Sequence, residues 1–147
     1  MSVKRWGVSN FEVDDMKELF SLEHGRKCAA NQVLYNLQNR EIEFDLLPWS
    51  QTNKIPIMAY SPVGHSGQLL RNAVLEKIAK THDATPAQIA LAWVLRQSGT
   101  IAIPKASNEE RIRDNAPSIK IKLTKKDLTD LDQEFPPPKS KRPLPIL

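Results

Sequence analysis

The chain of 147 residues has the length of one ordinary domain, and its 40% hydrophobic and 26% charged residues are typical of a soluble globular protein. The formal net charge of +4 would suit an anionic ligand or reflect scattered surface lysines, and no basic run with interleaved aromatic residues favours a nucleic-acid surface. The single cysteine excludes an intramolecular disulfide and a cysteine-based metal site, and no apolar run reaches the ~18 residues of a membrane span.

Strand-like and helix-like patterns take turns along the chain. In chain order, we expect a strand over 3–9, a helix over 11–24, a strand over 28–35, a helix over 40–53, a strand over 55–60, helices over 73–82 and 85–97, a strand over 100–104, and helices over 107–115 and 124–135. The proline-rich segment 136–147 is expected to lie extended along a surface. This alternation predicts the α/β class with a parallel sheet.

Several residues predict where these elements begin and end. Gly25 is expected to end the first helix, and Pro48 to kink or end the second. Cys28 is expected to be a small buried hydrophobe. Helix starts are expected at three pairs of residues: Thr85 with Gln88, Ser107 with Glu110, and Thr124 with Asp127.

Polar side chains stand where each predicted strand ends. These are Ser9–Asn10, Asn31–Gln32, Tyr60–Ser61 and Lys105. Because ligands bind at the carboxyl edge of parallel α/β sheets, we expect one binding rim there. The N-terminal stretch has no signal-peptide core, so a cytoplasmic location is the default expectation.

Five stretches in order, GVSNF, NQVLYN, AYSPVG, TPAQIALAWVLRQ and IPKASNEERIRDN, resemble the aldo-keto reductases. The resemblance implies the C-terminal half, strands five to eight, of a (β/α)8 barrel over residues 1–135, followed by the tail 136–147. It also implies NADPH as cofactor, bound without a GxGxxG motif. The compact size resembles bacterial members that reduce methylglyoxal and similar small aldehydes.

The resemblance assigns nicotinamide-side roles to the ends of the first three strands. Ser9, Asn10 and Gln32 would hold the carboxamide, and Tyr60 would stack on the ring. A turn with accessible backbone N–H groups would wrap the pyrophosphate, and it contains Ser61, Val63 and Gly64. From the residues alone, Ser9 and Asn10 could equally cap a helix, Tyr60 could be core, and the Ser-Pro pair an ordinary turn.

The resemblance assigns the other end of the cofactor to the segment after the fourth strand. Lys105 and Arg111 would hold the 2′-phosphate, with Ser107 nearby at a helix start. Asp114 and Asn115 would read the adenine edge. A solvated charged helix is the alternative, although it leaves Lys105 unexplained. Ala106 stands where many members have serine.

The family's catalytic Asp, Tyr, Lys and His lie on the first four barrel strands, so no catalytic residue is expected among these 147. We therefore expect the chain alone to be inactive, and either to pair with a complementing half-barrel chain, to dimerise, or to be a truncated product. A small carbonyl compound is the expected substrate of the completed site. Asn36, where many members have histidine, is assigned to the structure of the substrate loop.

Two other functions remain open at this point. One is a non-enzymatic NADPH-binding or subunit module. The other is a helix-turn-helix over 75–95, which the apolar run Ile89–Leu95 disfavours, because a recognition helix needs polar side chains.

Overall fold

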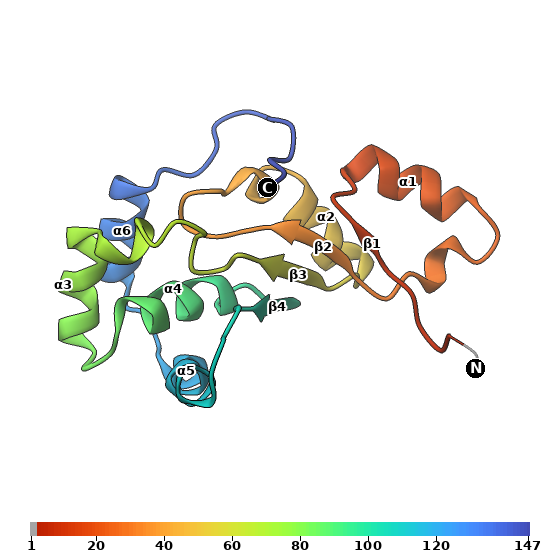
Figure 1. Ribbon diagram of the computed structural model, residues 1–147. Coiled ribbons are helices and arrows are strands. Elements are labelled where there is room, and N and C mark those ends of the chain that lie inside the picture. Colours follow the sequence, from red (N-terminus) through yellow and green to blue (C-terminus); the bar gives the residue numbers. More distant parts are fainter. Residues whose placement is uncertain (1–2) are drawn as a thin grey trace.

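The computed structural model describes residues 3–147, which form a four-stranded parallel sheet. The strands are β1 (Val8–Ser9), β2 (Asn31–Leu34), β3 (Ile57–Tyr60) and β4 (Thr100–Ile103). They lie in the order β1-β2-β3-β4, so each strand pairs with the next one along the chain (Figure 1). The predicted α/β class with a parallel sheet is confirmed.

Helices fill the connections between strands and follow the last one. The α-helices are α1 (Val13–Ser21), α2 (Leu46–Asn53), α3 (Ala73–Thr81), α4 (Pro86–Leu95), α5 (Glu109–Asn115) and α6 (Lys125–Glu134). Short 3-10 turns are η1 (Gly25–Lys27), η2 (Glu41–Glu43), η3 (Leu69–Arg71) and η4 (Ala116–Lys120). Every predicted helix is present, but most are shorter than the sequence pattern predicts.

The strands are also shorter than predicted, at one end or at both. Residues 28–30 follow η1 and are not part of β2. The N–H of Ala29 nevertheless donates to Trp6 O at 2.8 Å, which links this segment to the one before β1. The N–H of Ile55 donates to Ser50 O at 3.0 Å, so the start of the predicted strand 55–60 belongs to the end of α2. Strand edges of this kind are set by tertiary pairing rather than by local pattern.

The predictions for Gly25 and Pro48 were wrong. Helix α1 ends at Ser21, and Gly25 is needed for a close approach instead: a Cβ there would lie 1.7 Å from Leu19 O. Pro48 is the third residue of α2 and does not end it. Because first-turn N–H groups have no acceptor within the helix, proline is tolerated at that position.

Two of the three predicted helix starts are confirmed. Thr85 and Thr124 each accept a hydrogen bond from the backbone N–H three residues later, in reciprocal capping boxes. The prediction for Ser107 was wrong by one residue, because Asn108 caps α5 by accepting from the N–H of Arg111 at 3.0 Å. Asparagine is at least as good a cap as serine, so the pattern alone could not decide between the two.

The two faces of the sheet differ in burial. Side chains alternate between faces along each strand, and those of Val33 and Ala59 are fully buried against the helices. Gln32 and Met58 point to the other face and are half-buried, and Ile101, beside them in register, is 46% exposed. We call the surface carrying Gln32, Met58 and Ile101 the open face.

Helix α4 is the central helix of the core. Its residues Ile89–Val94 are all buried, and Trp93, fully buried, stacks against Tyr35 with ring centroids 5.1 Å apart. A helix buried on every side cannot present polar side chains to DNA, so the structure disfavours the helix-turn-helix reading.

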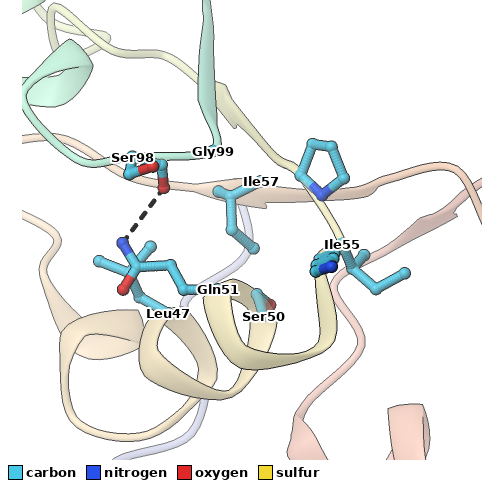
Figure 2. A pocket seen from close by; sticks show the side chains of 9 residues that line it. Leu47, Ser50, Gln51, Ile55, Ile57, Ser98 and Gly99 are labelled. Carbon is cyan, nitrogen blue, oxygen red and sulfur yellow. Dashed lines mark hydrogen bonds between the residues drawn. The ribbon is translucent and has the colours of Figure 1, made fainter.

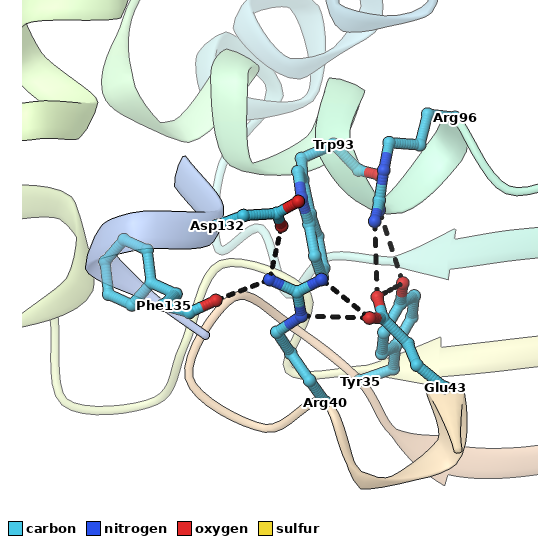
Figure 3. A network of polar contacts seen from close by, with 7 residues as sticks. All are labelled: Tyr35, Arg40, Glu43, Trp93, Arg96, Asp132 and Phe135. Carbon is cyan, nitrogen blue, oxygen red and sulfur yellow. Dashed lines mark hydrogen bonds and ion pairs between the residues drawn. The ribbon is translucent and has the colours of Figure 1, made fainter. Parts of the chain in front are cut away.

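A polar cluster joins α6 to the loop after β2 (Figure 3). The Arg40 guanidinium donates to Glu43 Oε2 at 2.7 Å, to Asp132 Oδ1 at 2.7 Å and to the Phe135 carbonyl oxygen. Arg96 donates to the other oxygen of Glu43 at 3.2 Å. Two cations and two carboxylates thus compensate each other's charge, which is the condition under which buried ion pairs are tolerated.

The tail after α6 (136–147) forms no helix or strand and packs against the start of the chain. Its Lys141 pairs with Glu12 at 3.4 Å and Asp45 at 3.3 Å, next to the starts of α1 and α2. The N–H of Leu144 donates to Glu12 Oε1 at 3.2 Å. Over residues 3–147 the helices include none that is both long and apolar enough to span a bilayer. The described part of the chain likewise gathers no His, Cys, Asp and Glu side chains into a metal-binding group.

Candidate functional site

The ends of β1 and β2 bring three predicted site residues together. Ser9 Oγ donates to Gln32 O at 3.0 Å, and the N–H of Asn10 donates to the same oxygen at 2.8 Å. Asn10 adopts a left-handed conformation with φ of 57°. Its Oδ1 atom is buried and has no hydrogen-bond partner among residues 3–147. Since buried polar atoms normally have partners, this oxygen is a candidate ligand-binding group.

Gln32 reaches this position in a way the sequence did not predict. Asn31 and Gln32 are the first residues of β2, not its carboxyl end, so that prediction was wrong. The register places Gln32 beside Ser9, the last residue of β1. Staggered pairing of this kind, which barrels require of their strands, sets the start of one strand beside the end of its neighbour.

Tyr60 and the turn after it lie further along the same edge. Tyr60 ends β3, is half-buried and is level with Leu34 and Ile103. It lies two residues beyond Met58, which is level with Gln32, so it stands roughly 7 Å further along the strand direction.

A tight turn follows Tyr60 and contains Ser61, Val63 and Gly64. The N–H of Gly64 donates to Ser61 O at 3.0 Å. Ser61 has a left-handed φ of 47°, which is uncommon for a residue with a side chain, and Gly64 has a φ of 73° that favours glycine. Val63 packs against the core and anchors the turn.

Asn31, expected on the rim without a role of its own, and Asn36, expected to support the substrate loop, hold these segments. Asn31 donates to Phe11 O at 2.8 Å, and Asn36 donates to Ser61 O at 2.9 Å. The contact with Ser61 differs from the substrate-loop role expected for Asn36. The available signal was an amide side chain within an otherwise apolar strand pattern, because a buried amide needs hydrogen-bond partners.

The predicted phosphate-binding segment leaves the sheet at the same edge. Ile103 is level with Tyr60, and Lys105 follows two residues later. Lys105, Ser107 and Arg111 are exposed, and within residues 3–147 neither cation forms an ion pair. By contrast, Arg113 on the same helix pairs with Glu109 at 2.6 Å.

The adenine-side residues lie at the end of α5. The carbonyl oxygen of Asp114 accepts from Gln88 Nε2, which ties this end of α5 to the start of α4. Asn115 is half-buried and lines an apolar groove of about 420 Å³ that also includes Ile101 and Ile112. Within residues 3–147 no hydrogen bond joins these side chains to Ser9 or Gln32.

Two further cavities differ in their relation to these residues. One, of about 420 Å³, lies on the open face and is lined by Trp6, Ser9, Gln32 and Met58 among others. The other, of about 290 Å³, lies at the amino ends of β3 and β4 (Figure 2). It contains none of the predicted site residues, and Ser50 Oγ, which faces it, has no hydrogen-bond partner within residues 3–147.

Comparisons with known proteins agree with the arrangement of the chain. A sequence model described as "Aldo/keto reductase family" matches residues 2–134. Methylglyoxal reductase YeaE of Escherichia coli is 45% identical over 149 residues, covering 99% of this chain and 52% of that protein. Glyoxal reductase of Bacillus subtilis is 35% identical over 130 residues, covering 88% of this chain and 45% of that protein.

The same similarity holds at the level of structure. An aldo-keto reductase from Klebsiella pneumoniae, solved in complex with NADPH, superimposes with a TM-score of 0.93 at 42% identity. The match covers 98% of this chain and 52% of the Klebsiella chain. The chain thus spans about half the length of the relatives that it matches. It belongs to the aldo/keto reductase family.

Proposed function

We propose that the chain forms the NADPH-binding half of an oxidoreductase that reduces small aldehydes or ketones by hydride transfer. One observation carries the proposal: Ser9 and Gln32 line one cavity on the open face, and Asn10, which follows Ser9, has a buried Oδ1 without a partner among the described residues. An amide or carboxamide donor would satisfy that oxygen. The relatives named as methylglyoxal and glyoxal reductases support a small aldehyde as substrate.

In this proposal the described residues fit a phosphorylated dinucleotide. Gln32 and Asn10 would hold the carboxamide and so fix which face of the nicotinamide ring meets the substrate. The half-buried Tyr60 offers its aromatic ring for stacking. Lys105 and Arg111, exposed and without an ion pair within residues 3–147, are available to a 2′-phosphate through charge-assisted hydrogen bonds. The bound cofactor would supply the hydride.

Neither Tyr35 nor His82 is placed to donate a proton for that chemistry. Tyr35 is fully buried and hydrogen-bonds to Glu43 at 2.6 Å; burial raises the pKa of its hydroxyl, and the nearby Arg96 opposes this only in part. His82 pairs with Asp127 at 2.8 Å, between α3 and α6 and away from the sheet edge. The proton would therefore come from residues outside these 147. On their own they would bind cofactor without turning over substrate.

We further propose that the sheet is half of a (β/α)8 barrel over residues 1–135, with 136–147 as its tail. Strands β1 and β4 each have a neighbour on one side only. Ile101 on the open face is 46% exposed, and Ile112 and Ile119, which line the groove beside β4, are 59% and 73% exposed. Four further β/α units, on the same or another polypeptide, would pair with both edges and cover the open face. A second copy of this chain is the competing occupant.

The cofactor assignment is tested by comparing affinities for NADPH and NADH. Wild type is expected to prefer NADPH, and Arg111→Ala to lose most of that preference, because removing a charged hydrogen-bond donor from a phosphate costs about 1.5–3 kcal/mol, or roughly 10- to 100-fold. Arg113→Ala is the matched control, since Arg113 lies on the same helix but pairs with Glu109. Equal affinities for the two nucleotides in wild type would rule the assignment out.

The catalytic assignment is tested by NADPH oxidation with methylglyoxal. The 147-residue chain should show no rate above a protein-free blank, because general acid catalysis typically contributes about 10²–10⁴-fold and the acid is absent. Measurable turnover by the purified chain would contradict the assignment.

A further inference from the structure

Two buried asparagines stand at the two ends of β2, the strand between β1 and β3. Asn31 is its first residue and is 0% exposed, and Asn36 lies two residues beyond its end and is 1% exposed. Placing an amide in a core is unfavourable unless its hydrogen bonds are made. In both cases the partners are backbone groups of neighbouring segments, not of β2 itself.

Asn31 holds the segment that follows β1. Its Nδ2 donates to Phe11 O at 2.8 Å, and its Oδ1 lies 3.4 Å from the Phe11 N–H that donates to it. One amide therefore satisfies both backbone groups of the same residue. Phe11 directly follows Asn10, whose φ of 57° lies in the left-handed region.

Asn36 holds the turn that follows β3. Its Nδ2 donates to Ser61 O at 2.9 Å, and its Oδ1 accepts from the N–H groups of Gln38 and Asn39 at 2.9 and 3.0 Å. Asn36 is thus held in place by hydrogen bonds within its own loop, and it donates to the loop that follows β3. Ser61, the residue that it grips, also has a left-handed backbone, with φ of 47°.

The two contacts share one physical consequence. Left-handed backbone in a residue with a side chain is unfavourable and persists only where the surroundings hold it. Each asparagine supplies such a hold, beside Asn10 in one case and at Ser61 in the other. Asn10 follows β1 and Ser61 follows β3, so both left-handed residues lie at the carboxyl edge of the sheet, to which the dinucleotide is assigned.

We propose that Asn31 and Asn36 are positioning residues of the dinucleotide site. From the two ends of β2 they hold Asn10 and Ser61 in left-handed conformations, in which Asn10 faces the nicotinamide and the turn at Ser61 faces the pyrophosphate of the cofactor. This inference rests on the proposed function. The inference adds that the asparagines support only the nicotinamide and pyrophosphate part of the site, because neither is hydrogen-bonded to the segment that carries Lys105 and Arg111.

The test uses Asn31→Asp and Asn36→Asp in the full chain. Aspartate keeps the size and the accepting oxygens of asparagine but cannot donate to Phe11 O or Ser61 O. Asn53→Asp is the matched control, since Asn53 Nδ2 donates to Trp49 O at 2.8 Å at the end of α2, which precedes the amino end of β3, whereas Tyr60 of the rim lies at its carboxyl end. The probes are NADPH and adenosine 2′-monophosphate, which carries only the adenine and 2′-phosphate groups.

Both test variants are expected to weaken NADPH binding about tenfold, the effect of one lost hydrogen bond at a site that must then reorder. Binding of adenosine 2′-monophosphate should change less than about twofold. Asn53→Asp should leave both affinities at the wild-type value. If buried aspartate prevents folding, checked by circular dichroism, Asn31→Ala and Asn36→Ala remove the same donor without a charge and should give the same pattern.

Equal weakening of both probes would show a general structural role and overturn the inference, as would unchanged NADPH affinity in both test variants. The proposed function fails separately, and on wild type alone, if that protein binds neither probe; the inference then falls with it.

Discussion

Arg40 connects three parts of the chain that are far apart in sequence, so its removal should be among the most destabilising single changes. Its side chain is 6% exposed, and it is hydrogen-bonded to Glu43, to Asp132 and to the Phe135 carbonyl oxygen. Arg40→Met keeps an unbranched apolar side chain but removes the guanidinium, whose carbon lies over the Trp93 ring, 5.0 Å from its centroid. The substitution deletes all of the hydrogen bonds.

The loss of stability depends on which partners of Arg40 are left as charges without a counter-charge. Breaking a buried ion pair costs about 3–5 kcal/mol when the remaining charge is stranded. Here Asp132 is 47% exposed and can be hydrated, and Glu43 keeps Arg96 at 3.2 Å. We therefore expect the lower end, about 3 kcal/mol, which is roughly a 10 °C fall in Tm for a chain of this length.

Thermal unfolding followed by circular dichroism is the assay. Glu43→Gln in the Arg40→Met background should lower Tm further, because it removes the carboxylate that still pairs with Arg96. Arg113→Ala, which breaks a pair whose side chains are both 77% exposed, should change stability by less than about 1 kcal/mol. If Arg40→Met lowers Tm no more than Arg113→Ala does, the reasoning about this cluster is wrong.

Two further predictions concern pH and assembly. Burial alone would raise the pKa of Asp127, but hydrogen bonds from His82 and Thr124 outweigh burial and lower the pKa below its ordinary value. The carboxylate therefore stabilises the fold above about pH 4, and this contribution is lost as pH falls further. The Tm of wild type should thus fall more steeply below about pH 4 than the Tm of Asp127→Asn. Parallel curves of Tm against pH would refute the assignment. Ile101→Asp, on the open face, should leave the Tm of the isolated chain within about 2 °C but prevent its association with a completing half-barrel in size-exclusion chromatography; association at the wild-type level would contradict the assigned surface.

The sequence predicts much of the fold, because several local signals agree with the final packing. The Thr85 and Thr124 caps are recognisable from three-residue spacing, and the apolar run Ile89–Val94 is buried as its composition indicates. The start of α5 was missed by one residue, since Ser107 and Asn108 are both good caps and only the folded geometry selects Asn108.

The site was harder to predict than the fold. Gln32 lies at the amino end of its strand and reaches Ser9 only through the stagger of β1 against β2, which no local pattern encodes. Asn31 and Asn36 act through backbone groups of Phe11 and Ser61, 20 and 25 residues away. An amide within an apolar strand pattern indicates that a partner is needed, but contacts to backbone carry no sequence signature at the partner, so only the three-dimensional arrangement identifies Phe11 and Ser61.

Hydrogen exchange with and without NADPH tests the central claim most directly, because it reports on every segment of the proposed groove in one measurement. We predict that NADPH slows exchange in three separate segments, residues 8–12, 60–66 and 103–115, while residues 46–56 around the cavity of Figure 2 are unaffected. Protection confined to 103–115, or absent from all three segments, would contradict the account that these segments border one dinucleotide site.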